Sequence, residues 1–266
     1  MLLKRILTAL IGIPIIFICL YFGTFPFFVM MLLVTFFCVQ EYLVLLKKYE
    51  PFTAVSLIMA VIFFIAIYFY FEVVMNNIAL VALIMLFKLF ALVVISGKMQ
   101  NCIAKISVSF LGAFFLPLSL SYMVLIRDLP NGLYYMFFLF LTVWILDTAA
   151  YGFGKKFGKR KLAKNVSPQK TVEGAIAGII FGIISAVALG LIFSIFAIWQ
   201  SIIFGFVIAV IGQFSDLAES LIKRDADIKD SGSIIPGHGG FLDRFDSYIF
   251  AAPAFYYLLI LIIPTY

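Results

Sequence analysis

The sequence of 266 residues is 65% hydrophobic, 18% aromatic and only 12% charged, with a formal net charge of +6. A soluble domain is about 45–50% apolar and about 25% charged, and at this length it has no interior that could bury 32 phenylalanines. The composition therefore excludes a water-soluble enzyme and a disordered chain, and it predicts a polytopic membrane protein.

Long apolar runs predict the membrane spans, because a bilayer core of about 30 Å needs about 20 apolar residues in a helix. The runs cover residues 6–22, 23–40, 51–71, 73–97, 106–126, 129–146, 174–215 and 247–266, and only 73–97 contains a charge, Lys88. The run 174–215 is long enough for two helices, with a turn predicted near Ser194 to Gln200. We therefore predict an all-α protein with about nine transmembrane helices, of which the first is an uncleaved span.

The basic residues predict the orientation in the membrane. Of the 19 Lys and Arg residues, 17 lie on one set of alternate connections, Arg127 lies on the other set, and Lys88 lies inside a span. Positive charge marks the cytoplasmic side, so we expect a cytoplasmic N-terminus in the cell (inner) membrane and no nucleic-acid partner. We expect residues 1–128 to form a scaffold of about five spans and residues 129–266 to carry the functional site.

Acidic residues gather in the second half, where nine of the 13 fall between 147 and 246. Asp216 and Glu219 close one predicted span and share a helical face, as do Asp243 and Asp246 at the start of the last span. One interpretation is that charges simply collect where helices leave the membrane. However, a carboxylate inside a bilayer is costly and a cation would offset much of that cost. We therefore expect two carboxylate faces to oppose one another at a cytoplasmic site for a hard divalent cation, Mg²⁺ above all.

Basic residues interleaved with these acids indicate that a polyphosphate binds beside the metal. They are Lys170, Lys223, Arg224, Lys229 and Arg244. The cluster at 155–164 fits equally well with a surface attracted to anionic lipid. Gly152-Phe153-Gly154, just before it, is interpreted as a turn whose backbone N–H groups could cradle an anion.

Residues 220–246 resemble the motif SxxKRxxxxKDxxxxxPGHGGxxDRxD of the bacterial CDP-diacylglycerol synthases, or phosphatidate cytidylyltransferases, at every fixed position. Residues 147–152, residues 167–174 and the pair Glu41-Tyr42 are similar to the same family. The resemblance implies that CTP and phosphatidate react to give CDP-diacylglycerol and pyrophosphate in phospholipid biosynthesis. It also implies a homodimer and a metal centre held by aspartates at these motif positions.

On this basis we expect Asp216 and Asp243 to be the principal metal ligands and Asp246 and Glu219 the secondary ones, with Mg²⁺ and a second cation as cofactors. The residues expected to hold the triphosphate or the lipid phosphate are Lys223, Arg224, Lys229 and Arg244. Those expected to line the substrate pocket are Asp147, Ser167, Lys170, Glu173 and Ser220. His238 either contacts a phosphate, with a role in protonating the departing pyrophosphate, or orients the Pro-Gly turn. Asp225 and Asp227 are interpreted as solvated charges. Asp230 is either a metal ligand or a turn former, and we favour the turn former.

Two other functions use similar residues. An ion-coupled transporter would place buried charges near the middle of the membrane on broken helices, whereas these acids map to one face. A CTP-dependent polyprenol kinase would use the same nucleotide but would transfer its terminal phosphate.

Overall fold

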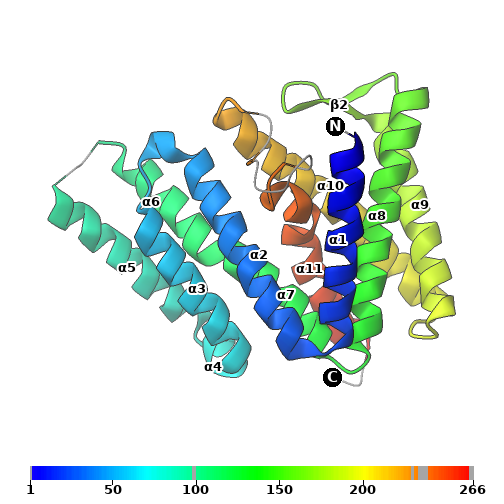
Figure 1. The fold of residues 1–266 in the computed structure, drawn as a ribbon, viewed down its shortest axis with the longest axis horizontal. Coiled ribbons are helices and arrows are strands. Elements are labelled where there is room, and N and C mark those ends of the chain that lie inside the picture. Colours follow the sequence, from blue (N-terminus) through cyan, green and yellow to red (C-terminus); the bar gives the residue numbers. More distant parts are fainter. Residues whose placement is uncertain (1, 98–99, 229–230, 233–238, 264–266) are drawn as a thin grey trace. The chain divides into compact units, whose positions relative to one another are not determined.

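The computed structural model describes residues 2–97, 100–228, 231–232 and 239–263, without the side chains of residues 2–7 and 9. Lys229, Asp230 and His238 therefore lie outside the described residues. The elements of the first half are α1 Leu2–Tyr21, α2 Thr24–Leu45, a 3₁₀ turn Lys47–Tyr49, α3 Thr53–Phe69, α4 Phe71–Asn76, α5 Ile78–Ser96, α6 Cys102–Phe110, a π-helical turn Leu111–Phe115 and α7 Leu116–Asp128. Those of the second half are α8 Gly132–Phe157, β1 Lys161–Ala163, β2 Ser167–Thr171, α9 Val172–Ile192, α10 Ile198–Asp225 and α11 Leu242–Ile262 (Figure 1).

The predicted all-α, polytopic membrane fold is confirmed. Within the described residues, seven helical segments are long and apolar enough to cross a membrane, and Leu10–Tyr21 and Thr53–Phe69 are shorter apolar helices. Each predicted span corresponds to one of these segments. Helices α6 and α7 form a single span, in which the π-helical turn precedes Pro117, a residue that cannot donate to the carbonyl four residues earlier. The connection between α9 and α10, residues 193–197, lies at the predicted turn.

The chain divides into two compact units. Unit 1 contains residues 1–124 and 230–244, and unit 2 contains residues 125–229 and 245–266. In unit 1, α2 and α3 pack through stacked rings such as Phe28 and Phe64, whose centroids are 5.8 Å apart. The division into a scaffold of residues 1–128 and a functional part of residues 129–266 stays a prediction.

Small residues let α9 lie close to both α8 and α10 in unit 2. A Cβ on Gly174 of α9 would come within 2.6 Å of the carbonyl oxygen of Ala150 on α8. A Cβ on Gly205 of α10 would come within 2.5 Å of the Ala186 Cβ on α9. Close approach through small residues is the usual way in which helices associate in a membrane, where no hydrophobic effect acts between them.

A two-stranded antiparallel hairpin, which the sequence did not predict, connects α8 to α9. The Glu173 carboxylate fixes its start by accepting backbone hydrogen bonds from Lys159 at 3.0 Å and Arg160 at 3.1 Å. Thr171 ends β2 and caps α9, since its hydroxyl oxygen accepts a hydrogen bond from the Gly174 N–H at 3.1 Å. Both ends of the hairpin are therefore tied to the start of α9.

The turn predicted at Gly152-Phe153-Gly154 is wrong, because α8 continues through these residues to Phe157. Their N–H groups belong to the helix and form no anion cradle. Gly154 serves packing, since a Cβ there would lie 3.5 Å from the Gly174 Cα and 3.0 Å from the Thr171 hydroxyl oxygen.

Candidate active site

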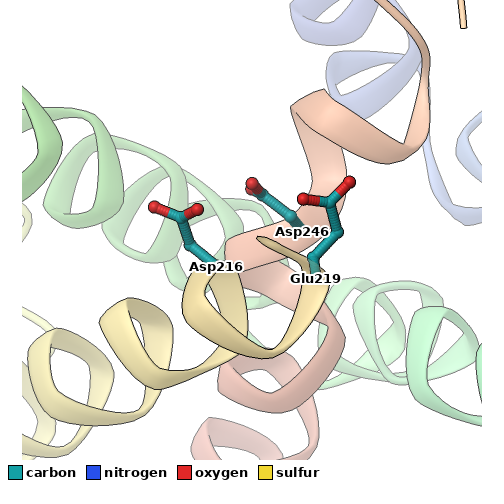
Figure 2. A group of neighbouring side chains, drawn as sticks. All are labelled: Asp216, Glu219 and Asp246. Carbon is teal, nitrogen blue, oxygen red and sulfur yellow. The ribbon is translucent and has the colours of Figure 1, made fainter. Parts of the chain in front are cut away.

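Three carboxylates from two helices meet in unit 2. Asp216 and Glu219 come from α10 and Asp246 comes from α11, and one oxygen of each lies within 4.8 Å of the others. Figure 2 shows Asp216 and Glu219 pointing to the same side of α10, with Asp246 of α11 between them. Asp216 and Asp246 are half-buried, and only 2% of Glu219 is exposed. The i, i+3 spacing that predicted a shared face for Asp216 and Glu219 is therefore realised in one continuous helix.

Side chains of α10 form hydrogen bonds to main-chain atoms of α11 and α9 beside the cluster. Ser215, which is buried, donates its hydroxyl to the Asp246 carbonyl oxygen and accepts the Phe250 N–H at 3.3 Å. On the neighbouring turn of α10, the Gln213 amide donates to the Ala175 carbonyl oxygen of α9 at 3.3 Å. The cluster thus lies on a rigid set of three helices, as a preorganised site requires.

Two lysines pair with the carboxylates. Lys170 of β2 forms an ion pair with Asp216, and Lys223, one turn further along α10, pairs with Glu219 at 2.5 Å. Three carboxylates and two ammonium groups leave a formal charge of −1. Asp147, exposed on α8, adds a fourth carboxylate that interacts electrostatically with Asp246. The site therefore combines a net negative charge with two ammonium groups.

The donor set fits a hard divalent cation. All three cluster ligands are carboxylate oxygens, without the sulfur or imidazole donors that softer metals prefer. Two like charges about 4 Å apart repel by about 4 kcal/mol at an effective dielectric of 20. A bound cation would relieve that repulsion, and the acidic cluster could hold a metal in this way.

Asp243 has a different environment from Asp246, although both lie on α11. In unit 1, one Asp243 carboxylate oxygen accepts the Ser231 N–H and hydroxyl, each at 3.0 Å, and the Gly240 N–H at 2.9 Å. These bonds tie the start of α11 to the segment that precedes it. The role of Asp243 as a principal metal ligand stays a prediction.

The other predicted site residues have varied surroundings. Arg224 donates to the Val166 carbonyl oxygen at 3.0 Å, and so fastens the hairpin turn to the end of α10. Glu173 holds Lys159 and Arg160 and thus has a structural partner at the hairpin. Ser167 begins β2, Ser220 is half-buried on α10, and Arg244 is exposed on α11. Lys229 and His238 cannot be placed, since they lie outside the described residues.

Glu41 is a residue whose structural role the sequence analysis missed. Its carboxylate, 4% exposed on α2, accepts the Phe241 N–H at 3.0 Å, the Leu242 N–H at 2.9 Å and the Ser231 hydroxyl at 3.2 Å. These bonds satisfy N–H groups at the start of α11, which no turn of the helix can satisfy. The available signal was an acidic residue following a long apolar run, a pattern that marks function in membrane proteins.

Comparisons with known proteins place the chain in a family. The model of the cytidylyltransferase family matches residues 3–262. Proteins named phosphatidate cytidylyltransferase match from Staphylococcus saprophyticus, with 44% identity over 165 residues, and from Bacillus subtilis, with 41% identity over 183 residues. These alignments cover 59% and 67% of this chain. They span 63% and 68% of the relatives' own length.

Proposed function

Because the chain belongs to the cytidylyltransferase family, we propose that it is a phosphatidate cytidylyltransferase. A phosphatidate phosphate oxygen forms a new bond to the α-phosphorus of CTP, the bond from that phosphorus to the β-phosphate oxygen breaks, and pyrophosphate leaves. The observation that carries the proposal is the cluster of Asp216, Glu219 and Asp246 with a lysine beside each of the first two. The reaction brings two polyanions together, so it needs a site whose cation and lysines offset the repulsion between them.

The residues have distinct tasks in this reaction. Asp216, Glu219 and Asp246 would hold Mg²⁺, and Asp243 stays a candidate ligand for a cation. Bound there, the cation supplies positive charge that offsets the repulsion between the two substrates. Lys170 and Lys223 contact phosphate oxygens and orient the α-phosphorus for in-line attack. The attacking phosphate is already an anion near neutral pH, so no general base is required.

We place the protein in the cell (inner) membrane with a cytoplasmic N-terminus and the acidic cluster on the cytoplasmic side. The support is the distribution of Lys and Arg over alternate connections. CTP is a cytoplasmic nucleotide, so this orientation also gives the site access to its substrate. The homodimer that the resemblance implies remains a prediction.

The direct test supplies purified full-length protein with phosphatidate and CTP labelled at either the α- or the γ-phosphate. We expect the α-label in the lipid, the γ-label in pyrophosphate, and no transfer when EDTA removes Mg²⁺. Label from the γ-position in a lipid product, with release of CDP, would instead identify a polyprenol kinase. Ion-driven uptake into vesicles without CTP, and no labelled lipid, would identify a transporter.

A substitution of Lys170 tests both its proposed contact with the nucleotide and its ion pair with Asp216. Lys170→Met removes the ammonium beside Asp216, so we expect kcat/KM for CTP to fall by about 10²-fold. The same change removes a competitor for the carboxylate, so Mn²⁺ should bind the nucleotide-free protein more tightly. Steady-state kinetics and Mn²⁺ titration followed by electron paramagnetic resonance measure the two effects. Lys164→Met, an exposed lysine of the same hairpin, is the control. Unchanged kinetics, or weaker Mn²⁺ binding, would contradict the assignment.

A further inference from the structure

A groove lies between α8 and α9, on the side of α8 that points away from the acidic cluster. Its volume is about 510 Å³, which is within the usual range for a ligand site. Ile145, Gly152, Phe153, Lys156 and Phe157 of α8 and Phe181 of α9 line it. Figure 1 shows these two helices side by side along their length, with the hairpin at one end.

The groove is separate from the site proposed above. Successive residues of a helix are rotated by about 100°, so the lining residues centre on Ala149 and Gly152, and Asp147 projects from nearly the opposite side of α8. Gly154, on nearly the same side of α8 as Asp147, packs against Thr171, whose neighbour Lys170 pairs with Asp216, so this side of α8 faces the cluster. The electrostatic interaction of Asp147 with Asp246 of α11 agrees with this. A molecule in the groove would therefore have α8 between itself and the carboxylates.

The groove combines an apolar floor with a cationic end. Ile145, Phe153, Phe157 and Phe181 each expose more than a third of their surface, although α8 and α9 are both candidate membrane spans. In a bilayer this surface contacts acyl chains. Lys156 lies on the lining one residue before α8 ends, at the end of a candidate membrane span. A mostly apolar groove with one ammonium group in its lining matches an acyl chain joined to a phosphate.

The surroundings of Lys156 favour an anion. Residues 148–172 contain seven Lys and Arg and no acidic residue. Arg160 is held by Glu173 and Lys170 by Asp216. Lys155, Lys156, Lys159, Lys161 and Lys164 are all exposed at the end of α8 and in the hairpin that follows it. Each basic residue near an anionic membrane surface contributes about 1 kcal/mol of attraction. A zwitterionic headgroup carries no net charge, so the positive charge of these lysines would not attract it.

We propose that this groove binds an anionic phospholipid, with one acyl chain against Phe153 and Phe181 and the phosphate beside Lys156. Gly152 sets the depth of the groove, because a Cβ at this position would meet no atom within 4 Å. This gives the glycine a role that a turn or an anion cradle does not explain. The inference does not depend on the reaction that the protein catalyses.

The test measures lipid binding to purified full-length protein by native mass spectrometry, with phosphatidylglycerol as the anionic probe and phosphatidylcholine as the neutral one. Phosphatidylglycerol is not a substrate of the proposed reaction, so a failed experiment would leave the proposed function intact. We expect phosphatidylglycerol to bind at least about 10-fold more tightly, a difference of about 1.4 kcal/mol. A photoactivatable acyl chain should crosslink to the peptide containing residues 145–157.

Two substitutions locate the lipid. Lys156→Gln should reduce the affinity for phosphatidylglycerol to that for phosphatidylcholine, and Gly152→Leu should weaken both by filling the groove. Matched controls in unit 1 are Lys47→Gln, at an exposed lysine, and Gly12→Leu, where a Cβ also meets nothing within 4 Å. Equal binding of the two lipids to the native protein would overturn the proposal. The proposal would also be overturned if substituting any lysine of 155–164 lowered the affinity for phosphatidylglycerol equally and Gly152→Leu had no effect. That result would indicate a diffuse basic surface and no groove site.

Discussion

Asp246→Asn is expected to lower kcat for CTP-dependent labelling of phosphatidate by at least about 10³-fold while the protein remains folded and inserted. Asn has nearly the same shape as Asp but carries no charge. The cluster then offers two carboxylates in place of three, and cation binding weakens. Removing one of three mutually repelling charges does not harm the fold, so the thermal midpoint without Mg²⁺ should stay the same or rise.

Two measurements check this expectation, the labelling assay and the shift of the thermal midpoint on adding Mg²⁺. A ligand that binds only the folded state raises stability, so the native protein should show a shift that Asp246→Asn loses. Asp225→Asn is the matched control, because Asp225 is exposed at the end of α10. An Asp246→Asn protein that keeps a tenth of the activity, or an Asp225→Asn protein that is equally damaged, would contradict the proposed ligand set.

Glu41→Ala is expected to have the second largest effect, although Glu41 is not part of the acidic cluster. The change leaves the Phe241 and Leu242 N–H groups without their acceptor, and the Ser231 hydroxyl keeps only its bond to Asp243. Each buried donor left unsatisfied costs about 1–3 kcal/mol. The segment that also carries Asp243 loses its attachment to α2, so we expect activity to fall by more than about 10²-fold. Glu41→Gln retains one acceptor oxygen and should give an intermediate loss.

Hydrogen exchange gives a local readout for this prediction. The amides of Phe241 and Leu242 should exchange faster in Glu41→Ala, whereas those of α10 should not change. Glu72→Ala serves as the control, since Glu72 is an exposed acid of unit 1. Normal kcat together with fast exchange at these two amides would show that the contacts stabilise the segment without supporting the reaction.

The membrane spans could be predicted because hydropathy is a property of the local sequence. The helical spacing of Asp216 and Glu219 was equally local, and α10 realises it. The separate surroundings of Asp243 and Asp246 could not be predicted from the same spacing. Asp243 lies in the first turn of α11, where unsatisfied N–H groups attract a carboxylate, and the Ser231 and Gly240 bonds depend on how a distant segment folds.

The hairpin escaped prediction because its strands lack the alternation of apolar and polar residues that indicates a sheet. It is held instead by Glu173 and Arg224, whose partners lie 13 to 58 residues away in the sequence. Gly152 and Gly154 were similarly misleading. Glycine usually indicates a turn, but here one glycine permits close helix packing and the other leaves a groove open.

The hairpin also limits how the length of this connection can vary. Side chains alternate between the two faces of a strand, so inserting one residue between Lys170 and Thr171, which pairs with Lys161 and caps α9, would turn Lys170 away from Asp216. Extra residues between the strands, at 164–166, would leave that pairing register intact. A surface connection normally tolerates changes in length, but in this one a single-residue change in the second strand would move a charge away from the site.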